Sequence, residues 1–195
     1  MNMKKYLVEG FGAFLLTLVV GFSLAGDFSV ATPILAGLTL GLFVYTAGGF
    51  SGAHINPAVT IGVWSLKKIS TKDALSYIIA QFVGAGFAML VVGAFAMPAP
   101  LAIANTWAVG LAEALGTMVF TFGIAAVVYE RVPVDARGLV IGGSLLLGIS
   151  IAAVASNGVL NPAVAFGIGS FSWVYVLSPI VGSLLGMNLY RWFNK

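Results

Sequence analysis

The chain has 195 residues, of which 60% are hydrophobic and only 8% are charged, whereas a soluble globular protein carries roughly 25% charged residues. Nine lysines and arginines and six aspartates and glutamates are too few to cover a water-facing surface, so the composition excludes a soluble enzyme and a large extramembrane domain. With no cysteine and a single histidine, disulfides, thiol catalysis and cysteine- or histidine-rich metal sites are excluded as well. We expect no cofactor and no enzymatic activity.

Six apolar segments are each long enough to cross a hydrocarbon core of about 30 Å as a helix. They cover residues 5–25, 32–50, 74–96, 107–129, 138–155 and 172–193. Two further apolar segments, at 57–66 and 162–170, are too short to cross, and each begins with a proline that follows an asparagine. The sequence therefore predicts an all-α membrane protein with six transmembrane helices and two half-membrane, re-entrant helices.

The basic residues predict the orientation in the membrane. With the N-terminus inside, six spans place every lysine and arginine in an inner segment: Lys4, Lys5, Lys67, Lys68, Lys72, Arg131, Arg137, Arg191 and Lys195. Because lysine and arginine are enriched in cytoplasmic loops, we expect a multi-pass protein of the cell membrane with cytoplasmic N- and C-termini. The lysines at 67–72 are assigned to orientation and contact with anionic lipids of the bilayer, and no nucleic-acid partner is expected.

The two halves of the chain repeat one another. Three matched pairs carry the repeat: Glu9-Gly-Phe-Gly-Ala with Glu113-Ala-Leu-Gly-Thr, Asn56-Pro-Ala-Val with Asn161-Pro-Ala-Val, and Gln81-Phe-Val-Gly-Ala with Pro179-Ile-Val-Gly-Ser. We predict one channel domain over residues 1–195, with repeat 1 at about 1–100 and repeat 2 at about 101–195. Because each half holds three spans, the second half is inverted relative to the first, which is an architecture of transport proteins.

The Asn-Pro-Ala triplets, Asn56-Pro57-Ala58 and Asn161-Pro162-Ala163, each predict a helix start. Asparagine is a good N-cap, and proline suits the first helical position because its missing N–H costs nothing there. In the inverted arrangement the two short helices meet start to start in mid-membrane. A cation about 5 Å from two ends of about +0.5 charge each is repelled by ~3 kcal/mol at an effective dielectric of ~20, whereas a neutral solute can accept hydrogen bonds from the two asparagine amides.

On these residues the chain resembles the major intrinsic protein family, the aquaporins and glycerol facilitators. The resemblance runs from about Glu9 to Arg191 and includes the segment 51–60 and the Gln-x-x-Gly-Ala of the third long span. It implies an hourglass pore in each subunit of a homotetramer, and passive conduction of water and of small uncharged solutes such as glycerol, urea, ammonia and dissolved gases. It also implies two ladders of backbone carbonyl acceptors: Gly52, Ala53, His54 and Ile55 on the inner side, and Asn157, Gly158, Val159 and Leu160 on the outer side.

The chain departs from the family at the outer constriction. The family typically has an arginine after the second Asn-Pro-Ala, where this chain has Val164, and the other three positions map to Ala36, Ile149 and Gly158. All four are apolar, so we expect a wider and drier constriction with poor selectivity for polar groups. Exclusion of cations and protons then depends on the two helix starts alone, and dewetting of the apolar constriction could slow water.

Glu9 and Glu113 lie inside predicted spans, where a charged side chain is costly. One hypothesis makes them the ion site of a coupled transporter. The favoured interpretation is structural: each carboxylate accepts N–H groups of a re-entrant loop, and Gln81 forms hydrogen bonds between helices. A third hypothesis is a structural membrane protein that keeps the fold but conducts poorly.

Overall fold

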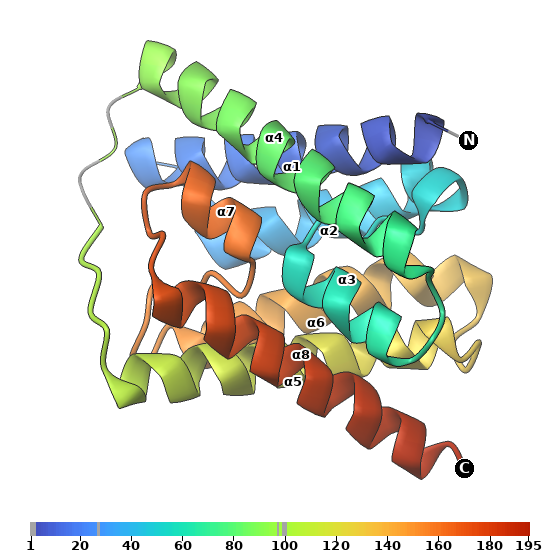
Figure 1. Cartoon of the computed structure of the whole chain (residues 1–195). Helices are drawn as coiled ribbons and strands as arrows, with labels where there is room; N and C mark the ends of the chain where they lie inside the picture. The colour runs from blue at the N-terminus through green and yellow to red at the C-terminus, as the bar shows by residue number, and fades with distance from the viewer. Residues whose placement is uncertain (1–2, 27, 97, 99–100) are drawn as a thin grey trace.

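The computed structural model describes residues 3–26, 28–96, 98 and 101–195 (Figure 1). Within these ranges six helices are long and apolar enough to cross a membrane. They are α1 (Lys4–Ala25), α2 (Thr32–Ser51), α4 (Thr71–Phe95), α5 (Trp107–Val128), α6 (Arg137–Ala152) and α8 (Trp173–Phe193). The two short helices are α3 (Pro57–Ser65) and α7 (Pro162–Gly167). The predicted all-α architecture with six spans and two half-length helices is therefore confirmed.

Three helix boundaries differ from the expected ones by three residues, and the others by at most one. A local hydrogen bond or an unusual backbone conformation accompanies two of the three. Helix α4 begins three residues early, at Thr71, because the Ser70 side chain accepts from the backbone N–H of Asp73. Helix α6 ends at Ala152 rather than at 155. Helix α7 has only six residues, and two residues after its end Gly169 adopts a φ of 80°, a left-handed conformation that glycine reaches without a steric penalty.

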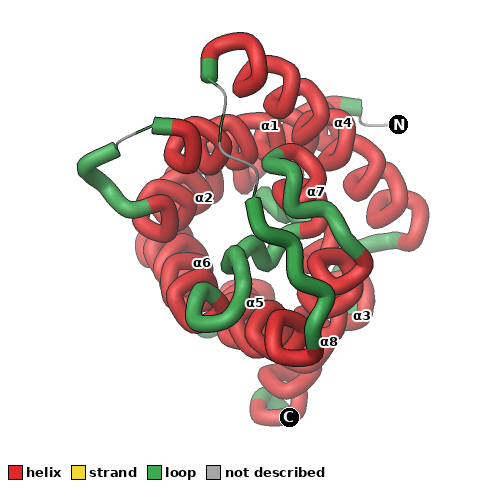
Figure 2. The backbone as a smooth tube through the Cα atoms, turned by 90° about the vertical axis from the view of Figure 1, so that its left-hand side faces the viewer, coloured by secondary structure: helices red, strands yellow, loops and turns green. Residues whose placement is uncertain are grey.

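The packing follows the repeat. Helix α1 packs against α4 and α2, and α5 packs in the same way against α8 and α6, while the contact between α2 and α6 joins the two halves. Viewed end-on, the long helices form a ring around the centre of the molecule (Figure 2). Both chain termini lie at one end (Figure 1).

The two short helices enter the bundle from opposite ends, with α7 on the left and α3 on the right of Figure 1. Helix α3 contacts α8 and α4, α7 contacts α4, α1 and α8, and the two short helices also contact each other. Each short helix is thus held by helices of both halves. This arrangement brings the starts of α3 and α7 together inside the ring.

Close helix contacts depend on a glycine at equivalent places in the two halves. A Cβ atom on Gly84 of α4 would collide with the carbonyl oxygen of Gly10 on α1, and one on Gly182 of α8 with the carbonyl oxygen of Ala114 on α5. Small residues at helix contacts allow backbones to approach closely in membranes, where the hydrophobic effect does not drive helix association. The α1–α4 and α5–α8 contacts are therefore close approaches of a glycine to the backbone of the neighbouring helix.

Replacing Gly84 with alanine should lower the stability of the fold. The new methyl group forces α1 and α4 apart, and overpacking of this kind costs about 1–3 kcal/mol. The measurement is thermal unfolding in detergent followed by circular dichroism. Gly93→Ala on the same helix is the matched control, because a Cβ there meets nothing within 4 Å; equal melting temperatures for the two variants would contradict this account of the α1–α4 contact.

Candidate pore

The two asparagines cap the two short helices with their side-chain oxygens. Asn56 Oδ1 accepts from the backbone N–H groups of Ala58 (2.8 Å) and Val59 (3.4 Å). Asn161 Oδ1 accepts in the same way from Ala163 (3.0 Å) and Val164 (3.3 Å). With its oxygen engaged, each asparagine presents only the NH₂ group to its surroundings.

Each asparagine amide donates to the loop of the opposite half. Asn56 Nδ2 donates to the carbonyl oxygen of Leu160 (2.9 Å), and Asn161 Nδ2 donates to the carbonyl oxygen of Ile55 (3.0 Å). These two bonds tie together loops that are more than a hundred residues apart in the chain. An NH₂ group has two hydrogens, so each amide retains a second N–H after the crossing bond is made.

A buried glutamate holds each re-entrant loop. Glu9 accepts from Ser51 Oγ (2.7 Å) and from the backbone N–H groups of His54 (2.9 Å) and Ile55 (2.6 Å). Glu113 repeats this set with the residues 105 positions further on, Ser156 Oγ (2.7 Å), Val159 N (2.9 Å) and Leu160 N (2.8 Å). Both carboxylates are fully buried and face the loops, on the side away from both cavities described below.

The loop backbones adopt the same unusual shape in both halves. Ala53 and Ile55 have φ values of 51° and 40°, and their counterparts Gly158 and Leu160 have 61° and 56°. Only one of the four is a glycine, and a residue with a side chain in the left-handed region costs of order 1–3 kcal/mol. The crossing amides and the glutamates thus hold the loops against local strain. Gly52 also has a positive φ, of 93°, where it ends α2.

Several residues that complete these loops were not identified from the sequence. Ser51 and Ser156 each accept from the loop backbone two residues further on (both 3.0 Å). The hydroxyl of Tyr77 donates to the carbonyl oxygen of Ser51 (2.7 Å), and that of Tyr175 accepts from the backbone N–H of Asn157 (3.0 Å). Both pairs recur at the spacings of the repeat, so comparing polar residues between the halves could have found them.

The first half carries one contact that the second lacks. Gln81 donates from Nε2 to Glu9 Oε2 (2.8 Å) and lies 3.0 Å from Thr60 Oγ1. Its counterpart in the repeat is Pro179, which lies inside α8 and has no polar side chain. The carboxylate of Glu9 is therefore bonded to a buried side-chain amide that Glu113 lacks.

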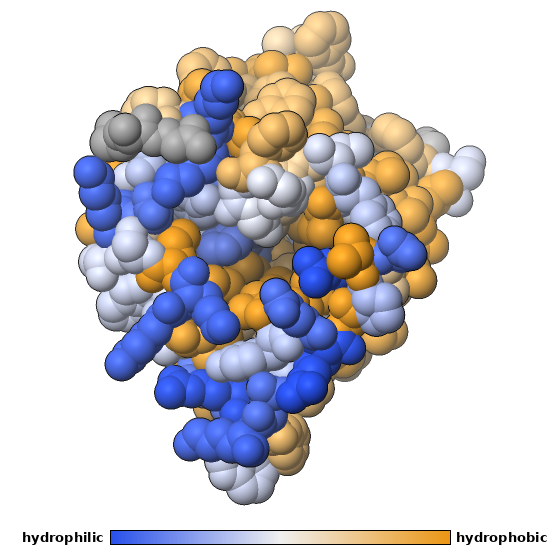
Figure 3. All heavy atoms as spheres, turned by 90° about the vertical axis from the view of Figure 1, so that its right-hand side faces the viewer, coloured by the Kyte–Doolittle hydropathy of each residue, from blue (hydrophilic) through white to orange (hydrophobic). Residues whose placement is uncertain are grey.

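Two cavities enter the ring of helices from opposite ends, and Leu40, His54 and Phe120 line both of them. The outer cavity has a volume of about 240 Å³ and contains all four residues predicted to form the constriction: Ala36, Ile149, Gly158 and Val164. Asn56 and Asn161 line it as well. The inner cavity, of about 790 Å³, opens at the end that carries both termini. Figure 3 views this end, where hydrophilic residues surround a hollow with an apolar floor.

Part of the lining of the inner cavity consists of repeat counterparts of residues that line the outer cavity. The four residues of the outer constriction have repeat counterparts that all line the inner cavity: Ile141, Val44, Ala53 and Val59. The pseudo-twofold axis is marked by α2 and α6, where a Cβ on Gly37 would lie 2.7 Å from the carbonyl oxygen of Gly142, its own counterpart. The two cavities therefore meet at the centre of symmetry of the molecule.

The predicted site residues differ in which cavity they line, and some of them line neither. Pro57, Ala58, Pro162 and Ala163 are buried behind the asparagines and line neither cavity. Residues 52–54 line the inner cavity, and Ile55, Asn157 and Val159 line the outer one, together with His54, which lines both. Leu160 lines neither cavity, and its carbonyl oxygen accepts from the amide of Asn56.

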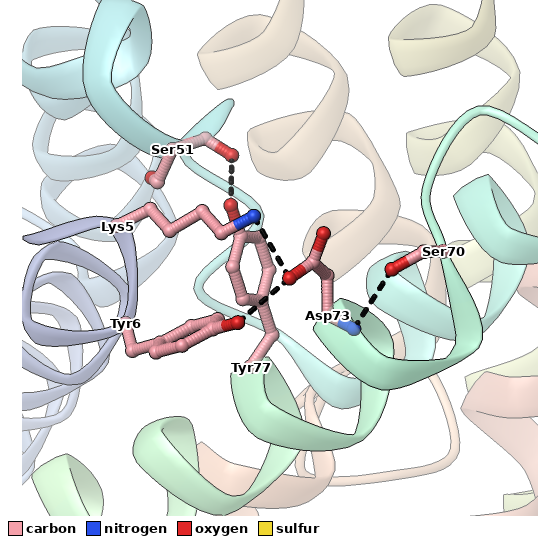
Figure 4. Close-up of polar contacts among 6 residues, drawn as sticks. All are labelled: Lys5, Tyr6, Ser51, Ser70, Asp73 and Tyr77. Atoms are coloured by element: carbon pink, nitrogen blue, oxygen red, sulfur yellow. Dashed lines mark hydrogen bonds and ion pairs between the residues drawn. The ribbon is translucent and has the colours of Figure 1, made fainter. Parts of the chain in front are cut away.

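Polar side chains brace the inner mouth (Figure 4). The Lys5 ammonium lies 2.8 Å from Asp73 Oδ1, which also accepts from the Tyr6 hydroxyl at 2.7 Å. These contacts tie the start of α1 to the start of α4 beside the inner cavity, which Lys5 and Asp73 both line. Among the described residues, no group of three histidine, aspartate or glutamate side chains is arranged to hold a metal ion.

Comparison with known proteins agrees with this architecture. The chain matches the model of the family "Major intrinsic protein" over residues 2–190. It is 34% identical to aquaporin AqpM of Methanothermobacter thermautotrophicus, covering 90% of this chain and 82% of that protein. It is 33% identical to glycerol uptake facilitator protein-like 6 of Lactiplantibacillus plantarum, covering 94% of each. The X-ray structure of the aquaglyceroporin from Plasmodium falciparum superposes with a TM-score of 0.76 at 22% identity, over 99% of this chain and 95% of that one. The chain is a multi-pass membrane protein of the major intrinsic protein family.

Proposed function

We propose that the chain is one channel domain that conducts water and small uncharged solutes passively through the two cavities and past the paired asparagines. The observation that carries this proposal is that two repeat-related cavities share lining residues inside the ring of helices, and that Asn56 and Asn161 line the outer one at that level. The relatives named as an aquaporin and as a glycerol uptake facilitator support the same class of function. No bond is made or broken, and no cofactor takes part.

The polar groups along the route suit a neutral permeant with an accepting oxygen. Each asparagine amide retains one N–H after its crossing bond, and the backbone carbonyls of residues 52–54 and of Asn157, Gly158 and Val159 supply acceptors on either side. Irregular backbone at membrane depth is tolerated where it lines a water-filled cavity. A water molecule or a small alcohol can therefore exchange its hydration partners for these groups as it crosses.

Ions are excluded by the positive ends of the two short helices. Both starts point toward the meeting place of the cavities, and the side-chain oxygen that caps each start belongs to a neutral asparagine, whereas Glu9 and Glu113 are engaged by the loops. The same engagement argues against ion-coupled transport, which needs a titratable group exposed to the lumen. With Val164 in place of a cationic side chain, the outer constriction adds no charge to this barrier.

The distribution of charge supports an orientation in the membrane. The basic residues lie near the chain termini and in the loops at 67–72 and 131–137, and by the positive-inside rule we infer cytoplasmic termini in a protein of the cell membrane. Exposed apolar side chains such as Leu38 and Leu42 on α2 and Leu139 on α6 face lipid or neighbouring subunits. We expect a homotetramer, as in the family.

The channel function is tested by stopped-flow shrinkage of proteoliposomes under osmotic gradients. The wild-type protein should shrink vesicles faster than lipid alone, and glycerol or urea gradients should then show which solutes follow water. Shrinkage at the rate of empty vesicles would contradict the proposal and favour a structural membrane protein of the same fold.

Val164→Arg should restore selectivity at the outer constriction. The guanidinium adds hydrogen-bond donors and bulk to a ring that otherwise holds alanine, glycine and isoleucine, so glycerol and urea fluxes should fall more than water flux. The same stopped-flow assay measures all three. Val164→Met is the matched control, because it fills similar space without donors; an equal effect of both variants would mean that bulk alone acts there.

Proton leak should fall in Val164→Arg relative to wild type by about tenfold or more. A unit charge a few Å from the route at an effective dielectric of ~20 repels a cation by several kcal/mol, and about 1.4 kcal/mol already gives a factor of ten. A pH-sensitive dye inside the vesicles measures the leak. A wild-type leak as low as that of the arginine variant would show that the helix starts suffice alone.

A further inference from the structure

The place where the two cavities meet has a distinct lining. Among the described residues, only Leu40, His54 and Phe120 line both cavities. Leu40 lies on α2 and Phe120 on α5, and their side chains are only 2% and 1% exposed. Any solute that passes from one cavity to the other must pass these three residues, so they bound the neck of the route, and Asn56 and Asn161 lie on its outer side.

Large side chains matched by the repeat surround the neck. Phe120 is the counterpart of Leu16, and Leu40 is the counterpart of Leu145. All four are buried, and Leu16 and Leu145 line the outer cavity alone. The two halves thus contribute matched large side chains around the centre of symmetry, and the largest of them, Phe120, stands at the neck.

Phe120 has little room to withdraw from the route. A Cβ atom on Gly148 of α6 would lie 3.2 Å from Phe120 Cβ, so the base of the side chain is held in the close contact between α5 and α6. In that contact a Cβ on Gly116 would collide with the carbonyl oxygen of Gly148. Because backbone atoms fix this contact, the base of the Phe120 side chain cannot move away from the neck without a shift of two helices.

The outer constriction offers no comparable obstacle. Its four residues are an alanine, a glycine, a valine and an isoleucine, and none of them bears an aromatic ring or a charge. The apolar side chains of Leu40 and Phe120 face a pair of amide donors. A solute in the neck therefore has hydrogen bonds on one side only and an apolar wall on the other.

We propose that, within the channel function proposed above, the neck formed by Leu40, His54 and Phe120, next to Asn56 and Asn161 of the outer cavity, is the size filter of this pore, in place of the outer constriction. The neck admits water in single file and slender neutral solutes that present one polar edge to the amides. Branched or bulkier polyols are retarded by the ring of Phe120.

The test compares the permeability ratio of glycerol to water in proteoliposomes carrying wild-type protein, Phe120→Ala or Phe120→Leu. Phe120→Ala should raise the ratio by about tenfold, because a hydrophobic constriction controls passage through its width, and Phe120→Leu should raise it less. Phe43 supplies the matched control. It is a buried phenylalanine on α2, 4% exposed, that lines neither cavity, so Phe43→Leu and Phe43→Ala should leave the ratio within about twofold of wild type.

The result that overturns the proposal is a conducting protein whose ratio is unchanged in both Phe120 variants. A rise in Ile149→Ala as large as that in the Phe120 variants also overturns it, because the filter would then lie in the outer constriction. If Phe120→Ala does not fold, Phe120→Leu decides the matter, since swaps that nearly conserve volume are usually tolerated. Wild-type vesicles no faster than empty ones overturn the channel function together with the filter, whereas a conducting wild type with unchanged ratios overturns the filter alone.

Discussion

The crossing of two asparagine amides is the interaction on which the rest of the structure depends. Each amide caps its own helix with its oxygen and holds the opposite loop with its nitrogen. Among the described residues, these two bonds are the only hydrogen bonds that join the α3 region, residues 51–65, to the α7 region, residues 156–167. Because both bonds are buried, breaking one would leave a donor and an acceptor unpaired, at about 1–3 kcal/mol for each group. Asn56 and Asn161 also line the outer cavity. The residues that join the two halves therefore also border the proposed route.

The strained loops explain why two acidic residues lie inside spans. A carboxylate in the membrane is costly, yet Glu9 and Glu113 each accept three hydrogen bonds from a loop whose backbone adopts left-handed conformations at non-glycine positions. Those bonds satisfy backbone N–H groups that would otherwise be unpaired at membrane depth. The loops are in turn free to direct carbonyl oxygens toward the cavities. The glutamates thus stabilise the polar lining of the route while remaining outside it.

Much of this arrangement could be predicted from the sequence, because its signals are long or repeated. The six spans follow from hydropathy over some twenty residues each, and the two helix starts follow from an Asn-Pro pair that occurs twice. The left-handed backbone at Ala53, Ile55 and Leu160 could not be predicted, since these residue types rarely adopt it and only tertiary hydrogen bonds impose it. The crossing partners of the two amides, more than a hundred residues away, have no local signal. The narrow neck at Phe120 was also missed, because one phenylalanine among fourteen is distinguished only by the cavities on either side of it.

The central claim is that the crossed amides border an open route and not a packed core. An experimental structure of the protein in lipid, at a resolution that shows ordered water, tests this claim most directly. We predict an unbroken file of water molecules from the inner to the outer cavity, with one or more waters within hydrogen-bond distance of both Asn56 Nδ2 and Asn161 Nδ2. Side chains packed against both amides, with no water between the cavities, would contradict the account.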